Sequence, residues 1–417
     1  MRETKSDKTR RGCAFTRVLG VVLLVLLILV SIAGAEPFAY ITNLDSDSVS
    51  VIDTATDAVT ATVNVGGKPY GISVTPDGTE AYVTNRDSNS VSMIDTATNT
   101  VTATVKVGVS PRGIAFTPDG LKAYVANYGD KTVSVINTST NTVVATIIVG
   151  DGPFGVAVTS DGTKVYVSNA NTNTVSVIDT ATNTVIAIVK VGISPRGVSV
   201  TPDGKKVYVA NFSRTTVSVI DASTNTVIAT VDVVDPLGVA VTPDGKKVYV
   251  TNFNTVSVID ISTDTVTAIV DVGLWPEGIA VTPDGTKVYV VNSASQNVSV
   301  IDTATNTVIA TVEAGIWPCG FGQFIVTASH NKDNSNSTFI VSSNTTSNST
   351  DKNTEAGTSI KPENGTLDLE QNNVTTVEKV EQTPEKTQIT NTPGFEAFGG
   401  IVSLLVVLLR KESKKGN

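Results

Sequence analysis

Residues 197–231 read GVSVTPDGKKVYVANFSRTTVSVIDASTNTVIATV, and this stretch determines the expected fold class. It contains four runs dominated by Val, Ile, Thr and Tyr, which are residues that favour strands. Turn residues separate the runs: Pro202-Asp203-Gly204 follows the first run, and Asn225-Thr226 precedes the last. We therefore expect four short antiparallel strands joined by tight turns.

This unit recurs along the chain. The second run of each copy carries a tyrosine, and the seven marker residues are Tyr40, Tyr82, Tyr124, Tyr166, Tyr208, Tyr249 and Tyr289. Successive tyrosines are 42, 42, 42, 42, 41 and 40 residues apart. A period near 42 residues with short β runs is typical of a β-propeller and not of a helical solenoid. We therefore predict an all-β domain over residues 36–327.

A strand count predicts how the ring closes. The chain enters at the second strand of a unit and ends with an isolated first strand, Gly320 to Val326, which gives twenty-eight strands, or seven blades of four. The last blade would then combine strands from both ends of the domain. Pairing of the N- and C-terminal strands would close the ring and remove a free sheet edge.

The Tyr-Val-Thr-Asn strand, the Pro-Asp-Gly turn and the Ser-Val-Ile-Asp-Thr segment resemble those of the YVTN-repeat β-propeller family. The resemblance covers residues 37–327 and all seven copies. It implies a propeller fold and, because this family includes archaeal surface-layer and cell-surface proteins, a place in the cell envelope. The seventh first strand, Gly320 to Phe324, departs from the pattern and lacks the Pro-Asp-Gly turn.

The N-terminus has the pattern of an export signal. Six basic residues precede an apolar run from Val18 to Val30, and Ala33-Gly34-Ala35 supplies the small residues that a signal peptidase needs. We predict a signal peptide over residues 1–35; the alternative is a retained membrane anchor. Removal of the signal would leave Cys319 as the only cysteine, so no disulfide could form within the chain.

The C-terminus, residues 392–417, resembles the PGF-CTERM sorting signal of archaeal surface proteins. Pro393, Gly394 and Phe395 precede an apolar stretch and a basic tail. The resemblance implies that an archaeosortase removes the tail and that a lipid anchors the new C-terminus in the membrane. A plain C-terminal transmembrane helix is the alternative. Both interpretations tether the body to the outer face of a cell membrane.

Residues 328–391 are rich in Ser, Thr and Asn and poor in apolar groups. Such a segment cannot bury enough surface to offset its chain entropy, so we predict a disordered stalk. Its Asn-x-Ser/Thr sequons predict a glycosylated spacer, and the body has three more sequons. The candidate glycosylation sites are Asn336, Asn344, Asn348, Asn364 and Asn373 in the stalk and Asn137, Asn211 and Asn297 in the body.

Charge and composition exclude several functions. The body carries fifteen basic and twenty-six acidic side chains, so a nucleic-acid partner is not expected. The only histidine, His330, lies outside the body, which rules out a His-rich metal site or a Ser-His-Asp triad there. Asp45 and Asp47 are only a fragment of a calcium loop. We therefore predict no metal and no cofactor.

The aspartates of the Val-Ile-Asp and Pro-Asp-Gly segments recur in nearly every copy. An active site needs one special carboxylate, whereas repeated equivalents indicate turn capping. The set comprises Asp53, Asp95, Asp179, Asp221, Asp260 and Asp302, with Asn137 in the remaining copy, and Asp77, Asp119, Asp203, Asp244 and Asp284 in the Pro-Asp-Gly turns.

Variation among the copies points to one face of the disc. The turns after the first and third strands are nearly constant and share one face, whereas the loops after the second and fourth strands vary and share the other. A Pro-x-Gly step before each first strand carries a different middle residue each time. These residues, with the two tryptophans before the last two prolines, are Tyr70, Arg112, Phe154, Arg196, Leu237, Trp275, Glu277, Trp317 and Cys319. We expect either a ligand-binding ring at the channel mouth or a cover over the blade ends.

Two functions remain. The first is an exported, membrane-anchored, non-enzymatic surface protein that acts structurally or binds other surface proteins or glycans of the cell envelope. The alternative is an exported propeller enzyme, a hydrolase or lyase with its site at the channel mouth. Cys319 is the one chemically distinctive residue there, and a lone cysteine is more often a packed apolar group. A haem or redox propeller lacks a body histidine and a Cys-x-x-Cys-His motif.

Overall fold

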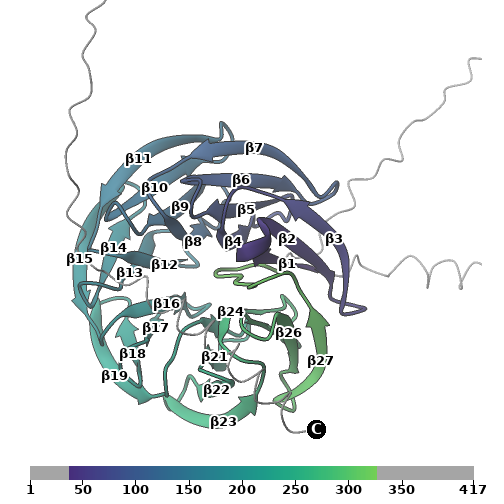
Figure 1. Ribbon diagram of the computed structural model, residues 1–417. Coiled ribbons are helices and arrows are strands. Elements are labelled where there is room, and N and C mark those ends of the chain that lie inside the picture. The colour runs from purple at the N-terminus through teal and green to yellow at the C-terminus, as the bar shows by residue number, and fades with distance from the viewer. Residues whose placement is uncertain (1–36, 326–417) are drawn as a thin grey trace, which may run out of the picture. The chain divides into compact units, whose positions relative to one another are not determined.

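The computed structural model describes residues 37–325 as seven β-sheets, or blades, arranged in a ring (Figure 1), with the innermost strands around a central channel. We number the blades in chain order. Blade 1 contains β1 (Phe38–Asn43), the short 3-10 helix η1 (Leu44–Ser46), β2 (Ser48–Asp53) and β3 (Ala58–Asn64). Blade 2 contains β4 (Pro69–Val74), β5 (Glu80–Asn85), β6 (Ser90–Asp95) and β7 (Thr100–Lys106). Blade 3 contains β8 (Pro111–Phe116), β9 (Lys122–Asn127), β10 (Thr132–Asn137) and β11 (Thr142–Ile148).

The remaining blades repeat this order. Blade 4 contains β12 (Pro153–Val158), β13 (Lys164–Asn169), β14 (Thr174–Asp179) and β15 (Thr184–Lys190). Blade 5 contains β16 (Pro195–Val200), β17 (Lys206–Asn211), β18 (Thr216–Asp221) and β19 (Thr226–Asp232). Blade 6 contains β20 (Val239–Val241), β21 (Lys247–Thr251), β22 (Thr255–Asp260) and β23 (Thr265–Asp271). Blade 7 contains β24 (Pro276–Val281), β25 (Lys287–Asn292), β26 (Asn297–Asp302) and β27 (Thr307–Glu313). The predicted seven-bladed propeller is confirmed.

The core lies between neighbouring blades. Each blade buries its two middle strands, and all seven marker tyrosines are completely buried. Tyr124 and Val135 of blade 3 belong to one buried cluster with Val165 and Ile178 of blade 4. Because each blade is apolar on both faces, it can bury its side chains only between two others, and stability depends on the complete ring.

The marker tyrosines also join the blades through their hydroxyl groups. Each hydroxyl donates to an Asn or Asp side chain in the last turn of the next blade, for example Tyr166 to Asn225 at 3.0 Å. Oxygen-to-oxygen distances of 2.5 to 3.1 Å join six of the seven pairs. The seventh pair, Tyr289 with Asp57, joins blade 7 to blade 1. All seven acceptor residues have positive φ, which Asn and Asp tolerate better than most residues.

The outer edge of every blade is bulged. The register between the third and fourth strands shifts once in each blade. In blade 3, Val135 pairs with Ala145 and Ile136 with Val143, so Val144 is the extra residue. A bulge bends an edge strand and makes it a poorer template for pairing with another chain.

The ring closes between the two ends of the domain, as predicted, but through an irregular segment. Tyr40 N–H of β1 donates to the carbonyl of Phe324 at 2.9 Å, and Cys319 N–H donates to that of Thr42 at 2.8 Å. Between these contacts the segment turns toward blade 2, where Ile72 N–H of β4 donates to the carbonyl of Phe321 at 3.1 Å. Gly322 permits this path, because its φ is +136° and a Cβ there would lie 2.3 Å from the carbonyl oxygen of Ile72. Blade 1 therefore has three regular strands and an irregular fourth.

Three predicted segments lie outside the described residues: the signal peptide (1–35), the stalk (328–391) and the sorting segment (392–417). Among the residues that are described, no helix is long and apolar enough to span a membrane.

Candidate functional site

The turns after the first and third strands of each blade form one end of the disc, here called the constant face. Side chains stabilise these turns by hydrogen bonds to the main chain. Asp203 accepts hydrogen bonds from the Thr201 hydroxyl at 2.7 Å and from the Lys205 N–H at 3.1 Å. Asp221 accepts from the Ser223 hydroxyl at 2.6 Å and the Thr224 N–H at 2.9 Å, and these bonds lower its pKa to about 2. The predicted turn-capping role of the repeated aspartates is confirmed.

The opposite end of the disc, here called the variable face, is held differently. Its loops are joined by main-chain hydrogen bonds, such as Phe212 N–H to the carbonyl of Ser194 at 3.1 Å and Leu44 N–H to that of Trp317 at 3.0 Å. Side chains also accept main-chain N–H groups in these loops, but their type differs between blades: Ser194 N–H donates to Asn173 at 2.9 Å, and Leu274 N–H donates to Ser295 at 2.8 Å. The variable face therefore tolerates more residue types than the constant face does.

Seven Pro-x-Gly steps bring the predicted ring residues to the variable-face end of the channel. The glycine lets neighbouring inner strands approach closely, since a Cβ on Gly155 would lie 2.3 Å from the carbonyl oxygen of Arg196. Ser168 also donates from its hydroxyl to that carbonyl at 2.5 Å. The x residues therefore meet around the channel axis.

Most of these x residues form a buried apolar cluster, here called the plug. It comprises Tyr70, Phe154, Leu237, Cys319 and Phe321, all exposed by 6 % or less. The Phe154 and Phe321 rings meet edge to face with centroids 5.1 Å apart. The plug fills the variable-face end of the channel, so these side chains pack against one another. Sequence reasoning missed Phe321, because it lies two residues beyond the Pro-x-Gly position.

The two predicted arginines lie on the aromatic rings of the plug and its neighbours. Arg112 is 4.5 Å from the centroid of Tyr70, and Arg196 is 3.9 Å from that of Phe212 and 5.2 Å from that of Phe154. The Nε atoms of both arginines are buried and make no hydrogen bond with any described residue. Cation–π contact with aromatic faces is therefore their main interaction within the described domain.

Glu277 is buried beside the plug, at 7 % exposure, and accepts a hydrogen bond from the Trp275 indole N–H at 3.0 Å. Burial, and then the charge of Glu277, raises the pKa of both the Cys319 thiol and the Tyr70 hydroxyl well above their ordinary values. The thiolate is the nucleophilic form of cysteine. A buried thiol that stays protonated is therefore a packing group of the plug.

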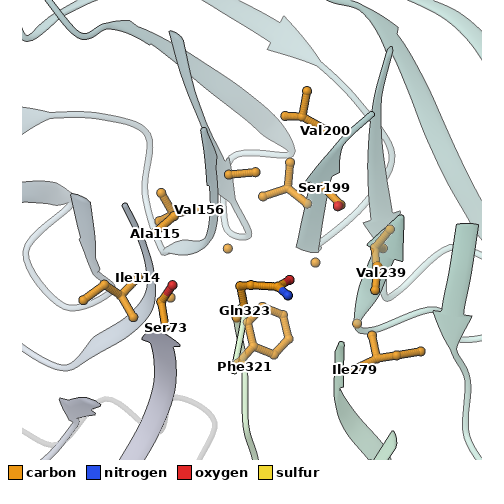
Figure 2. A pocket seen from close by; sticks show the side chains of 18 of the residues that line it. Ser73, Ile114, Ala115, Val156, Ser199, Val200, Val239, Ile279, Phe321 and Gln323 are labelled. Atoms are coloured by element: carbon orange, nitrogen blue, oxygen red, sulfur yellow. The ribbon is translucent and has the colours of Figure 1, made fainter. Parts of the chain in front are cut away.

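Beneath the plug, the channel encloses a cavity of about 370 Å³ (Figure 2). Small and apolar side chains line it, including Ser73, Ala115, Val156, Ser199 and Val239, with Gln323 from the closing segment. Of its lining residues, only Glu277 is titratable. The cavity therefore offers no second acid or base to work with Glu277.

The variable face exposes an apolar side chain at the same loop position in five of the seven blade connections. These residues, here called the apolar ring, are Val109, Ile193, Val234, Leu274 and Ile316, and their exposed fractions range from 37 to 63 %. Sequence reasoning missed them because exposed apolar side chains cannot be told from buried ones by residue type alone. Trp317, which was predicted, packs against the plug.

A second cavity of about 370 Å³ opens on this face above blade 6, and we call it the blade-6 groove. Its lining residues are Phe212, Ser213, Asp235, Leu237, Asn252, Phe253, Trp275 and Pro276. It includes two predicted residues, Leu237 and Trp275. The structure thus divides the predicted ring between the plug, the two arginines and this groove.

The body sequons differ in accessibility. Asn211 is completely buried, and its amide donates to Thr216 and Ser218, so the folded domain does not present it for glycan attachment. Asn137 and Asn297 are partly exposed. The five stalk sequons and the sorting motif Pro393, Gly394 and Phe395 lie outside the described residues.

No metal site is assembled in residues 37–325, because no three metal-ligating side chains cluster there. Asp45 forms an ion pair with Lys68 at 2.7 Å, and Asp47 accepts a hydrogen bond from the Lys68 N–H at 2.8 Å. Both carboxylates therefore stabilise the loop of blade 1.

Together, the fold and the plugged channel define a seven-bladed β-propeller with one constant and one variable face. The chain belongs to the YNCE-like beta-propeller family, which its sequence matches over residues 13–127 and 162–263. This confirms the expected membership of a YVTN-type propeller family. No curated protein matches the chain.

Several solved structures share the fold. A chain of Kuenenia stuttgartiensis hydrazine synthase is 29 % identical, with a TM-score of 0.59 over 64 % of this chain and 92 % of that one. A protein of unknown function from Desulfotomaculum acetoxidans is 19 % identical, with a TM-score of 0.59 over 68 % of this chain and 99 % of that one. The dihydro-heme d1 dehydrogenase NirN is 15 % identical, with a TM-score of 0.53 over 70 % of this chain and 75 % of that one. The last two similarities show the fold alone.

Proposed function

We propose that this protein is an exported, membrane-anchored, non-enzymatic propeller of the archaeal cell surface, of the surface-layer type, that binds another envelope component through its variable face. The apolar ring carries this proposal. Five connections place Val, Ile or Leu in water at one repeat position, although the fold needs no apolar residue there, since Gly67 and Asp151 occupy the other two connections. Clustered exposed apolar side chains mark interaction surfaces.

The constant face provides the contrast. Its turns keep their polar side chains because these bind the main chain, as Asp203 does. The turns of the constant face are similar in all blades, so they offer a partner no distinctive set of side chains. Only the variable face offers a distinctive set. We therefore assign docking to the variable face and folding to the constant face.

The chemistry of the interior supports a binding function over the enzyme alternative. The plug occupies the channel mouth where a hydrolase or lyase site was expected, and its only sulfur, that of Cys319, is fully buried. The relative named hydrazine synthase is an enzyme, but fold alone does not transfer an activity.

Display on the cell surface rests on the termini. The predicted signal peptide, the sequon-rich stalk and the Pro393-Gly394-Phe395 motif together motivate export and anchoring. The test is the intact mass of the protein isolated from its native membrane. A chain that starts at Glu36, ends near Pro393 and carries lipid and glycan mass is expected; a chain that retains Arg410 to Asn417 without lipid would refute sorting.

Docking is tested by cross-linking on intact native cells. We expect the triple variant Val234→Glu/Leu274→Glu/Ile316→Glu to lose at least tenfold of the cross-linked adducts that the natural protein forms, because three charges cannot be buried in an apolar contact. The control is Leu121→Glu on the constant face, where Leu121 is also exposed. Equal adduct yields from the triple variant and the natural protein would refute docking through this face.

A further inference from the structure

The blade-6 groove exists because two loops of this region are short. Asn211 and Thr216 of blade 5 are five positions apart, whereas the equivalent Asn252 and Thr255 of blade 6 are three positions apart. The connection from Val233 to Pro236 is also one residue shorter than that from Val191 to Pro195. These deletions are the reason for the tyrosine spacings of 41 and 40 residues, and they leave a hollow where other blades have paired loops.

Three aromatic rings surround the hollow. Trp275 is the central wall, and its ring meets Phe253 at 83° and Phe212 at 67°, with centroids 5.7 and 6.2 Å apart. Phe253 is 53 % exposed, so its ring is open to a ligand. The blade-6 groove thus combines apolar walls with an accessible mouth.

The Trp275 ring is held in place by its surroundings. Its main chain has a φ of +56°, and the residue before the proline has a positive φ in all seven connections, so the repeat itself fixes this conformation. Its N–H donates to the carbonyl of Phe253 at 2.8 Å, and its indole N–H donates to Glu277 at 3.0 Å. The Trp275 ring is therefore a fixed wall of the groove.

The polar groups of the blade-6 groove define the ligand class. Asp235 and Ser213 are exposed at the groove, and no Lys or Arg lines it, which disfavours an anion. The guanidinium of Arg196 lies 3.9 Å from the centroid of Phe212, so that ring already has a cation on one face. The exposed Phe253 ring and the Asp235 carboxylate match a ligand whose C–H faces pack on aromatic rings and whose hydroxyl groups donate to a carboxylate.

We propose that the blade-6 groove binds a neutral sugar ring of an envelope glycan. Its volume of about 370 Å³ lies in the range of small-molecule sites. Trp275 and Phe253 supply the stacking faces, and Asp235 accepts hydrogen bonds from sugar hydroxyls. This inference rests on the proposed function, because it names the partner chemistry of the variable face.

The test measures sugar binding by fluorescence of the full chain. The chain has two tryptophans, so a Trp317→Phe background leaves Trp275 as the only tryptophan reporter. The probes are the methyl glycosides of glucose, mannose and galactose and their neutral disaccharides, with methyl glucuronide and trimethyllysine as charged comparisons. A polyoxyethylene detergent is required, because alkyl glycoside detergents carry sugar rings.

We expect saturable binding of at least one neutral glycoside and at least tenfold weaker binding in Phe253→Ala. The matched control is Leu121→Ala on the constant face, since Leu121 is 54 % exposed and Phe253 is 53 % exposed. Both variants should unfold at the temperature of the Trp317→Phe parent. Binding of trimethyllysine or methyl glucuronide alone, or of no probe, would overturn the inference.

The result separates this inference from the proposed function. If no neutral sugar binds but the triple variant of the apolar ring still loses its cross-links, the docking proposal stands and the sugar inference fails. If sugars bind and the triple variant keeps its cross-links, the blade-6 groove is a glycan site and the apolar ring is not the docking surface.

Discussion

The constant and variable faces are built from the same repeat yet satisfy their main-chain groups in different ways. On the constant face, side chains such as Asp221 and Thr201 bind the turns, so the same residue types return in each blade. On the variable face, neighbouring loops bind each other through main-chain atoms, as between Ser293 and Trp275 at 3.0 Å, and through side chains whose type differs between blades, such as Asn173 and Ser295. A repeat protein can therefore diversify one face without disturbing its folding, because several residue types can serve the hydrogen bonds of that face.

The largest expected effect on stability comes from breaking the contact between a blade and the constant-face turn of its neighbour. Tyr166→Ala removes a fully buried ring and its bond to Asn225, and should lower the free energy of unfolding by about 3 to 5 kcal/mol. Thermal unfolding measures the loss. Tyr166→Phe is the control: it removes only the hydroxyl and should cost about 1 kcal/mol. Similar losses in both variants would mean that the hydrogen bond and not the packing holds the blades together.

The next effect concerns the plug, which lies at the variable face but is packed like a core. Phe154→Ala should lower the free energy of unfolding by about 3 kcal/mol, because Phe154 is buried against Tyr70 and Phe321. It also removes an aromatic face shared by Arg112 and Arg196. Urea unfolding measures the change. A loss below about 0.5 kcal/mol would place Phe154 among the surface residues of this face.

The architecture was predictable because its signals are repeated. Seven tyrosines at near-equal spacing indicated seven blades. Each blade needs its tyrosine for packing and for a hydroxyl hydrogen bond to the next blade, as Tyr166 shows. A feature that seven copies share is visible in a single sequence. The strand count also anticipated the closure of the ring, but not the path of Phe321 toward blade 2, because Gly322 occurs in one copy only.

The site was predictable in part. The Pro-x-Gly step correctly located residues at the channel mouth, but it could not show that Tyr70 and Phe154 point inward to form a plug. That outcome depends on the width of the channel, which a local motif does not encode. The spacings of 41 and 40 residues did carry the signal for the blade-6 groove, since both deletions fall in loops of the variable face.

A smaller effect is the pH dependence of stability that Asp221 gives to the constant face. The Ser223 hydroxyl and the Thr224 N–H hold the pKa of Asp221 at about 2, below its usual value, so ionised Asp221 favours the folded state. This contribution is present above about pH 4 and is lost as the pH falls toward 2. Asp221→Asn should be slightly less stable than the natural protein at pH 6, and the difference should shrink at pH 2. Asn137 caps the same turn of blade 3, so the variant retains the fold. A difference that is independent of pH in thermal unfolding would mean that ionisation does not contribute to the cap.

The smallest expected effect on stability is that of the apolar ring itself. Leu274→Ser should change the free energy of unfolding by less than about 0.5 kcal/mol, because half of the Leu274 side chain is already in water and its loop is held by the main-chain bond from Ala294 to Leu274 at 3.2 Å. The matched substitution on the constant face is Thr201→Ala, which removes the hydroxyl that donates to Asp203 and accepts from the Lys206 N–H at 3.0 Å. That loss should lower the free energy of unfolding by about 1 to 2 kcal/mol, and urea unfolding measures both variants.

If Leu274→Ser costs as much as Thr201→Ala, the exposed apolar residues stabilise the fold, and the assignment of folding to the constant face and docking to the variable face is wrong. If it costs nothing, the apolar ring is a surface that folding does not require, which leaves binding as the physical reason for its composition.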